Sequence, residues 1–359
     1  MNDAANESGQ ENDASDAPLE TVTDSGGDAP MTDGGHLDGS VDASDAGSNA
    51  DADTGADADA GPTNVLASGL NHPSGIKVDT QNVYWADYGV GTTDGVIYQL
   101  PLSGVHDAGA PIQIATGLWQ PFSVLVSGSN VYFTAADTVN VVPVGGGTVT
   151  VLASGQNRPF QIVLDSTYIY WTSLGNGTVA RTPLAGGGSV DGGPVEVLAT
   201  GQNQPKGLVR DLQNLYWVTY ADGNVLSLPL PYADGGTPTT LASGQLNAYG
   251  LAVNNTALFW TRASGGTNDT VVELSPGSPP ITVANGQATP EGIAMDAINL
   301  YWANSLTSDI MEAPIGTTVD SGAPKILAQG NQSAQWIALD TDYVYWTDGK
   351  AGLVSRVAK

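Results

Sequence analysis

The sequence lacks cysteine altogether, has only ten lysine and arginine residues among 359, and contains no apolar run approaching the ~20 residues of a membrane span. The absence of cysteine excludes disulfides, thiolate metal sites and a cysteine nucleophile. The first residues, MNDAANESGQ, have neither the charged nor the apolar region of a signal peptide. We therefore expect no membrane span and no export signal in the chain as given.

Negative charge is abundant and unevenly distributed. Residues 1–62 contain sixteen Asp or Glu and no Lys or Arg. Subtracting these sixteen from the 37 acidic residues of the chain leaves 21 against ten basic residues, so the remainder carries −11 of the net charge of −27. Because both regions repel a polyanion, we expect no nucleic-acid partner.

Residues 1–62 consist largely of Ala, Asp, Gly and Ser, as in DGSVDASDAGSNADADTGADADAG. Such a segment cannot bury enough surface to offset its chain entropy, so it is predicted to be a disordered acidic tether. Its NADADTG stretch spaces oxygen ligands as a calcium loop does. However, Thr54 stands where an EF-hand loop needs Gly and Ala60 where it needs Glu, so no metal site is assigned.

The rest of the chain, residues 63–359, is built on an internal repeat marked by an aromatic pair. The seven copies are Tyr84-Trp85, Tyr132-Phe133, Tyr170-Trp171, Tyr216-Trp217, Phe259-Trp260, Tyr301-Trp302 and Tyr345-Trp346. Successive second members lie 48, 38, 46, 43, 42 and 44 residues apart, which is close to the length of a four-stranded propeller blade. The sequence predicts an all-β, seven-bladed β-propeller.

The two ends of the repeat region indicate how the ring closes. The last repeat stops after its third strand, GLVSRVAK at 352–359, whereas an orphan TNVLASG at 63–69 precedes the first repeat. Elsewhere this sequence forms the fourth strand of a blade. We therefore expect the N-terminal strand to pair into the last blade, which removes two exposed strand edges.

The aromatic strands also carry a family motif. Residues 345–348 read YWTD, and YWAD at 84–87, YWTS at 170–173 and YWAN at 301–304 are near copies. Residues 63–359 thus resemble the YWTD β-propellers of low-density-lipoprotein-receptor-related proteins and their bacterial relatives. Those propellers have six blades, so six blades is kept as an alternative. The resemblance implies extracytoplasmic binding of a protein or other ligand rather than catalysis.

A ligand site is expected at the mouth of the central channel, where the loops leading into the inner strands meet. The residues just before the inner strands align as Ser74, Phe122, Phe160, Lys206, Tyr249, Glu291 and Gln335, followed by Gly75, Ser123, Gln161, Gly207, Gly250, Gly292 and Trp336. These positions vary while the scaffold does not, so they are free for function. We assign a protein, peptide or glycan ligand to Phe160, Lys206, Tyr249, Glu291 and Trp336, with Arg158, Trp119, His72, Tyr88 and Arg262 nearby.

An Asp or Asn ends most inner strands, at Asp79, Asp165, Asp211, Asn254, Asp296 and Asp340. These residues resemble a ring of metal ligands. Because the next strand follows within three or four residues, we predict that they form turns instead. No cofactor is assigned.

Three functions are compatible with this pattern. A propeller lyase or lactonase needs a His pair or a carboxylate cluster around a divalent ion, but the repeat places His72 and His106 on opposite faces. No catalytic residue is assigned. A self-associating surface protein is a third possibility. We favour a non-enzymatic binding scaffold.

Acidic tethers of this composition commonly follow the lipidated cysteine of bacterial surface lipoproteins. The tether therefore suggests a lipid anchor supplied by a segment upstream of the sequence given. On this hypothesis the protein is extracytoplasmic, either secreted or at the cell surface.

Overall fold

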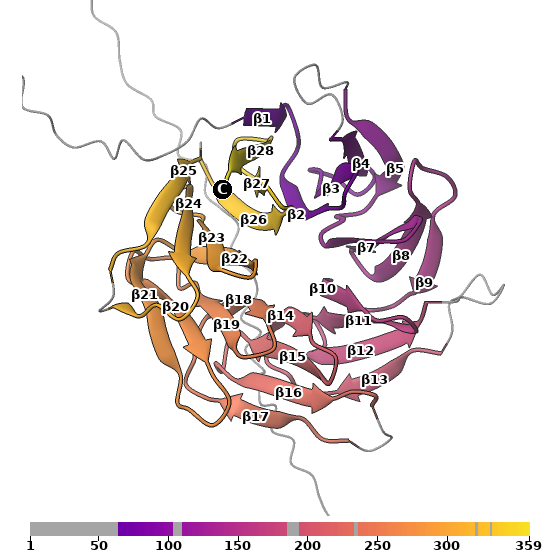
Figure 1. Ribbon diagram of the computed structural model, residues 1–359. Helices are drawn as coiled ribbons and strands as arrows, with labels where there is room; N and C mark the ends of the chain where they lie inside the picture. The colour runs from indigo at the N-terminus through magenta and orange to yellow at the C-terminus, as the bar shows by residue number, and fades with distance from the viewer. Residues whose placement is uncertain (1–63, 103–109, 185–193, 233–235, 320–321, 331) are drawn as a thin grey trace, which may run out of the picture. The chain divides into compact units, whose positions relative to one another are not determined.

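The aromatic repeats fold into seven four-stranded antiparallel sheets in the described part of the chain (Figure 1). The computed structural model describes residues 64–102, 110–184, 194–232, 236–319, 322–330 and 332–359. The expected tether and His106 lie outside these residues. The predicted all-β, seven-bladed propeller is confirmed, and the six-bladed alternative is wrong.

Each of the first six blades is formed by four consecutive strands, numbered outward from the channel. Blade 1 has β2 (Pro73–Val78), β3 (Asn82–Asp87), β4 (Gly95–Pro101) and β5 (Ile112–Leu118). Blade 2 has β6 (Val124–Ser127), β7 (Asn130–Ala135), β8 (Thr138–Pro143) and β9 (Thr150–Ala153). Blade 3 has β10 (Pro159–Leu164), β11 (Tyr168–Ser173), β12 (Thr178–Pro183) and β13 (Glu196–Ala199).

The remaining blades follow the same order, except at the last one. Blade 4 has β14 (Pro205–Arg210), β15 (Asn214–Thr219), β16 (Val225–Pro229) and β17 (Thr239–Ala242). Blade 5 has β18 (Ala248–Val253), β19 (Leu258–Arg262), β20 (Asp269–Leu274) and β21 (Ile281–Gln287). Blade 6 has β22 (Pro290–Met295), β23 (Asn299–Asn304), β24 (Asp309–Pro314) and β25 (Lys325–Gln329). Blade 7 has β26 (Ala334–Leu339), β27 (Tyr343–Asp348), β28 (Leu353–Ala358) and, on its outer edge, β1 (Asn64–Ala67).

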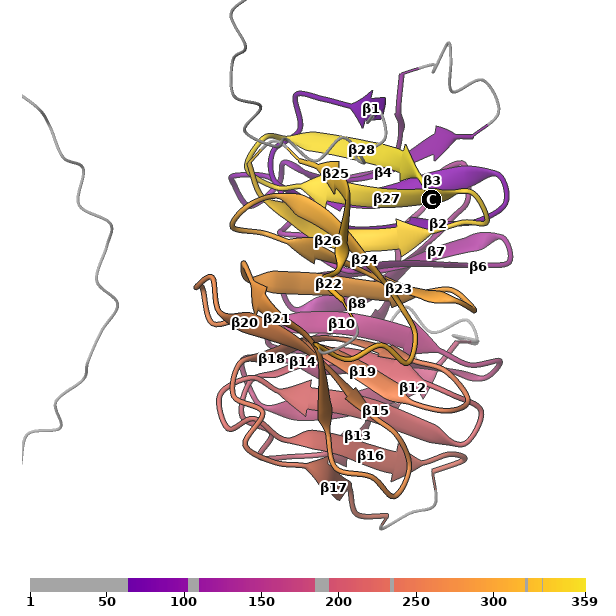
Figure 2. The same cartoon turned by 60° about the vertical axis from the view of Figure 1, so that its left-hand side comes forward.

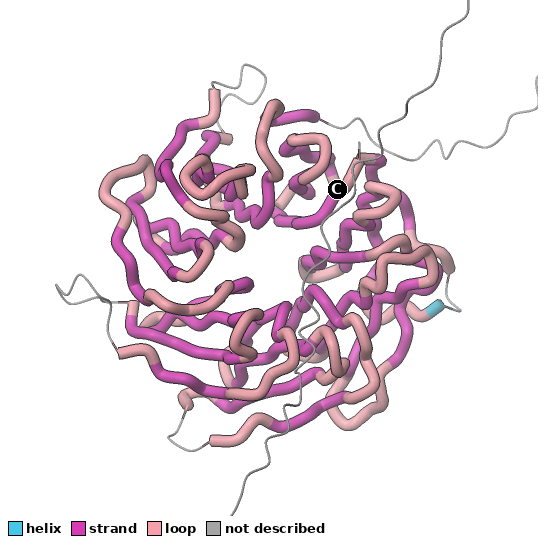
Figure 3. The backbone as a smooth tube through the Cα atoms, turned by 180° about the vertical axis from the view of Figure 1, so that it is seen from behind, coloured by secondary structure: helices cyan, strands magenta, loops and turns pink. Residues whose placement is uncertain are grey.

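The ring closes through the first and last strands. β1 pairs antiparallel with β28, with Val65 opposite Ser355, so the predicted closure is confirmed. The inner strands of neighbouring blades contact one another around the whole ring, including β26 with β2. Strands account for most of the ring seen from behind (Figure 3). Among the described residues, none of the helices has the length and apolar character needed to cross a membrane.

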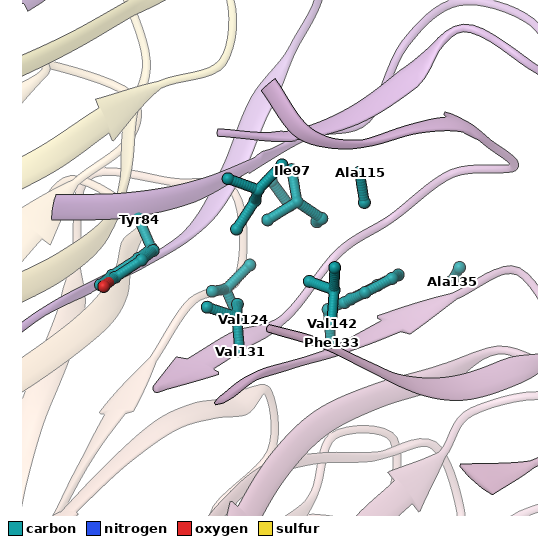
Figure 4. Close-up of a cluster of buried hydrophobic side chains, with 10 residues drawn as sticks. Tyr84, Ile97, Ala115, Val124, Val131, Phe133, Ala135 and Val142 are labelled. Carbon is teal, nitrogen blue, oxygen red and sulfur yellow. The ribbon is translucent and has the colours of Figure 1, made fainter. Parts of the chain in front are cut away.

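The two members of each aromatic pair point to opposite faces of their sheet. Tyr84 belongs to a buried cluster with Phe133 and Val142 of blade 2, and Figure 4 shows this layer. Trp85 packs on the other side, against Tyr345 of blade 7. Sheets of neighbouring blades therefore lie face to face (Figure 2). Burying one such ring stabilises the fold by about 4 to 6 kcal/mol before entropy is subtracted.

The polar ends of the aromatic rings are held by recurring partners. The indole N–H groups of Trp171, Trp217 and Trp302 donate to the side chains of Gln156, Gln202 and Gln287, which explains the repeated SGQ, TGQ or NGQ sequence. The tyrosine hydroxyls of Tyr84, Tyr170, Tyr216, Tyr301 and Tyr345 donate to Asp79, Asp165, Asp211, Asp296 and Asp340.

The same aspartates also form the predicted turns. Asp165 Oδ1 accepts hydrogen bonds from the backbone N–H groups of Thr167 and Tyr168, and Asp79, Asp211, Asn254, Asp296 and Asp340 accept in the same way. The expected Asx role is therefore confirmed. The described residues contain no group of three or more His, Asp or Glu side chains arranged to hold a metal ion.

Glycine and threonine let the inner strands approach closely. A Cβ at Gly250 would collide with the carbonyl oxygen of Glu291 on the next inner strand. Thr261 Oγ1 joins the same two strands, since it accepts from Gly250 N at 2.9 Å and donates to Glu291 O at 2.8 Å. These contacts fix the first residues of β18 and β22, where the candidate site residues Tyr249 and Glu291 lie.

Candidate functional site at the channel mouth

Four of the predicted site residues occupy one equivalent position. Phe160, Lys206, Tyr249 and Glu291 are the second residues of β10, β14, β18 and β22, so they lie inside the inner strands and not before them as predicted. Pro or Ala precedes each of them. Trp336 is the third residue of β26, in register with the glycines of other blades.

Aromatic rings from opposite sides of the propeller meet at the mouth. The ring centroids of Phe160 and Trp336, from blades 3 and 7, lie 5.8 Å apart. Phe122, in the β5–β6 loop, lies 4.5 Å from Phe160 and 5.2 Å from Trp336. Tyr249 of blade 5 lies 6.0 Å from Phe160 and 6.3 Å from Trp336. These four rings, the aromatic cluster, contact one another across the mouth of the channel.

The Lys206 ammonium lies at the edge of the aromatic cluster, over the ring of Tyr249 and over that of Tyr220, which is not part of the cluster. Its Nζ is 3.7 Å from the ring centroid of Tyr220 and 4.0 Å from that of Tyr249. Such contacts attract a cation to the negative face of the ring. Burial nevertheless lowers the pKa of Lys206 to about 8, although the Glu291 charge opposes this shift and the smaller effect of the Arg158 charge adds to it. No described residue accepts a hydrogen bond from this ammonium, so its donors are available to a ligand.

Glu291 supplies a carboxylate to the same cluster. Ser305, in the β23–β24 loop, donates its hydroxyl to Glu291 Oε1 at 2.9 Å, and the Tyr249 hydroxyl also hydrogen-bonds to this carboxylate. Burial raises the pKa of Glu291, although Ser305 and the Lys206 charge oppose the rise. Burial and the Glu291 charge raise the pKa of Tyr249 well above its usual value. The hydroxyl of Tyr249 is therefore neutral at ordinary pH.

Of the residues predicted to lie near the site, the structure brings only some into contact with the aromatic cluster. Tyr88 packs edge-on against Phe122 with centroids 6.5 Å apart, and burial raises its pKa while the Arg158 charge opposes the rise. Trp119 is half exposed and makes no ring contact among the described residues. Arg262 turns away, with Nε donating to the carbonyl oxygen of Leu246 at 3.2 Å.

The loop residues that lead into six inner strands share a left-handed backbone conformation although none is glycine. They are His72, Gln120, Arg158, Gln204, Asn247 and Thr289, with φ between 50° and 65°. In five of these loops the carbonyl of this residue accepts a hydrogen bond from the segment that follows the aromatic strand, as Gln204 does from Tyr220 N. This conformation is unfavourable for a β-branched residue such as Thr289. It fixes the position of Tyr220 relative to Lys206.

Two residues of the site were not predicted. Tyr220 and Ser305 come from loops between the second and third strands, whose lengths differ between repeats. The repeat alignment therefore assigns them no equivalent position. Phe122 was aligned with the other mouth residues but was not included among those assigned to the ligand.

The arrangement combines aromatic surface with one cation and one carboxylate. Partly exposed rings bind sugar faces or apolar side chains, and a free ammonium binds a carboxylate or carbonyl oxygen. Lys206, Tyr249 and Glu291 are also groups that transfer protons, and burial has moved their pKa values. The geometry is thus compatible with binding and with acid–base chemistry.

No protein-family model and no curated protein matches the sequence. Among solved structures, virginiamycin B lyase from Staphylococcus aureus is similar at 14% identity and a TM-score of 0.65, covering 83% of this chain and 98% of that chain. A catalytically inactive form of that lyase with quinupristin gives the same identity, the same TM-score and 99% of that chain. The WD40 β-propeller domain of Doa1 is 12% identical, with a TM-score of 0.60 over 83% and 97% of the two chains. Because these identities are low, the similarity to the solved structures shows the β-propeller fold alone.

Proposed function

We propose that this protein is a non-enzymatic binding scaffold whose ligand contacts the aromatic cluster and Lys206. The observation that carries the proposal is the meeting of Phe122, Phe160, Tyr249 and Trp336 at one end of the channel, from positions that vary among the repeats. The scaffold does not require these residues, because other blades hold Ser74 or glycine at the same places.

The ligand class follows from the chemistry of the cluster. Aromatic anchors surrounded by polar groups are typical of the centres of interfaces with proteins, peptides and glycans. The Lys206 ammonium, held over Tyr220 with free donors, selects a ligand that carries a carboxylate or carbonyl oxygen. A peptide or glycan with such a group fits both features.

The family and location proposed from the sequence are kept as part of this proposal. The YWTD-type motif is supported by the Tyr345–Asp340 hydrogen bond and its four counterparts, which give the motif tyrosine a structural role. Extracytoplasmic location and a lipid anchor rest on the composition of residues 1–62. The DNA upstream of the coding sequence tests the anchor, since a signal sequence with a lipid-attachment cysteine is expected there.

Binding is tested by probing a random-peptide display library and a glycan array with the purified protein. We expect ligands that bind the wild type and lose about tenfold or more in affinity with Lys206→Met and with Trp336→Ala. Leu212→Ala is the matched control, because Leu212 is 88% exposed in the turn at the far end of β14. If every selected ligand binds all variants equally, the aromatic cluster is not the site.

A second candidate function, a propeller lyase, is favoured by the pKa of Lys206. An amine that titrates at about 8 is a competent general base near neutral pH, and the neutral Tyr249 hydroxyl beside it is a proton donor. Liquid chromatography of quinupristin incubated with the protein distinguishes the two functions. Consumption of quinupristin that Lys206→Met abolishes supports the lyase, and an unchanged compound supports the scaffold.

A further inference from the structure

The inner strands of all seven blades line a central cavity of about 560 Å³ behind the aromatic cluster. This volume lies within the range of roughly 300 to 1,000 Å³ that is usual for small-molecule sites. Residues from β2, β6, β10, β14, β18, β22 and β26 contribute to its wall. The cavity is therefore enclosed by the most regular part of the fold.

The wall of this cavity carries two charges, and both are positive. In blade 1, Ile76 pairs with Trp85, the second residue of the aromatic pair, and Lys77 is the next residue along the inner strand. At the position of Lys77 the other blades have Leu125, Val163, Val209, Ala252, Ala294 and Ala338. Arg210 is the residue after Val209 in blade 4. At the position of Arg210 the other blades have Val78, Val126, Leu164, Val253, Met295 and Leu339. The scaffold accepts an apolar residue at both positions.

Lys77 projects into the cavity without a protein partner. Its side chain is exposed to solvent inside the cavity although protein surrounds it, and this enclosure lowers the pKa of the ammonium. No described residue makes a hydrogen bond or an ion pair with it. An ammonium in such a place is stabilised by any anion that enters the cavity.

Arg210 is held at the wall with part of its guanidinium unused. Its Nη1 donates to the carbonyl oxygen of Leu164 at 3.1 Å, while its Nε is buried without a partner. The planar guanidinium presents donors that match a carboxylate or phosphate. No Asp or Glu is among the residues that line the cavity, and the Asp165 carboxylate, whose pKa the Arg210 charge helps to lower, lies outside the lining.

We propose that the central cavity binds a small organic anion bearing carboxylate or phosphate groups, with Lys77 and Arg210 as its counter-charges. Trp336 belongs both to the wall of this cavity and to the aromatic cluster, but Lys77 and Arg210 lie outside the cluster, so the proposal does not depend on the proposed function. The surrounding acidic protein surface repels anions, so a positive interior makes binding selective for anions that fit within it.

The test is isothermal titration calorimetry, which measures the affinity of the full chain for inorganic phosphate and for succinate at low ionic strength. We expect saturable binding of at least one probe, and about tenfold or greater weakening in Lys77→Met, because a charge-assisted contact is lost. Preference for phosphate or for succinate shows which of the two groups the natural ligand carries. Lys77→Met should fold normally, since Leu125 occupies the same position in blade 2.

Lys350→Met is the matched control, because Lys350 is exposed in the β27–β28 turn and outside the cavity. A second measurement follows acylation of the Lys77 amine by mass spectrometry, with and without the probe, and protection specific to Lys77 is expected. Failure of both probes to bind the wild type overturns the proposal. Equal binding by Lys77→Met and wild type overturns it as well. Neither outcome bears on the ligand of the aromatic cluster.

Discussion

The Nζ atom of Lys206 lies 3.7 Å from the centroid of the Tyr220 ring, within one blade, and the Tyr249 ring of the next blade lies 4.0 Å from the same atom. Two neighbouring blades thus share one ammonium. Burial lowers its pKa to about 8, which makes this contact sensitive to pH in an accessible range.

The pH dependence of stability should carry a contribution from Lys206. Its folded pKa of about 8 lies below the value of 10.5 expected in the unfolded chain, so the unfolded state binds more protons between these values. The cost of burying the charged ammonium is fully present below pH 8, and it is relieved as the buried amine loses its proton while the pH rises towards 10.5. The free energy of unfolding of the wild type, relative to Lys206→Met, should therefore rise by on the order of 3 kcal/mol. Urea denaturation of both proteins across this range measures it, and a constant difference would contradict the assignment.

Replacing Thr261 by Val should destabilise the propeller by about 2 to 3 kcal/mol, because Gly250 N and Glu291 O then lose their shared hydroxyl. Thr270→Val in the neighbouring strand is the control. The Thr270 hydroxyl is buried without a partner, so its removal should be neutral or stabilising. Urea denaturation measures both variants. The denaturation midpoint of Thr261→Val should fall, whereas that of Thr270→Val should stay at the wild-type value or rise. Equal midpoints would show that the bridge is unimportant.

Gly292→Ala should cost about 2 kcal/mol or more, because the added methyl would meet the carbonyl oxygen of Gln335 on the next inner strand. Gly266→Ala places its methyl at an ordinary contact distance from Ser264 and should change stability by less than about 0.5 kcal/mol. Thermal unfolding compares the two. A melting temperature of Gly292→Ala equal to that of the wild type would mean that the inner strands separate easily.

Closure of the ring is tested on two adjacent residues of β1. Leu66 is 8% exposed and packs between blades 7 and 1, whereas Val65 is 55% exposed. Leu66→Asp buries an unpaired carboxylate and should destabilise the protein by about 3 kcal/mol or more. Val65→Asp should have a much smaller effect on the melting temperature. Similar losses in both variants would indicate that β1 adds backbone pairing but no packing.

The fold was predictable because the residues that recur in the repeat are those that the packing between blades requires. Tyr84 and Trp85 fill the two layers on either side of their sheet, and this requirement recurs in every blade with spacing close to a blade length. The Asp79 turn follows from local chain properties in the same way. The closure by β1 and β28 was predictable for another reason, since a fourth-strand sequence stands before the first repeat and the last repeat lacks one.

The candidate site was predictable only where it lies on an inner strand. Alignment placed Phe160, Lys206 and Glu291 at the mouth because the equivalent positions of all blades face it. Tyr220 lies in a loop of variable length, and its contact with Lys206 depends on how that loop folds. Lys77 was recognisable as the only charge at its repeat position, but its projection into a cavity is a property of the closed ring.

The seam between β1 and β28 also sets the order in which the molecule can be completed during synthesis. In the first six blades every strand pairs with a strand adjacent to it in the sequence, so its partner is synthesised shortly before or after it. Val65 pairs with Ser355, so β1 cannot form this pairing until about 290 further residues have been synthesised. Contacts between such distant segments form slowly. The nascent protein therefore carries an unclosed propeller, with exposed blade faces at both of its ends, until the last strand arrives.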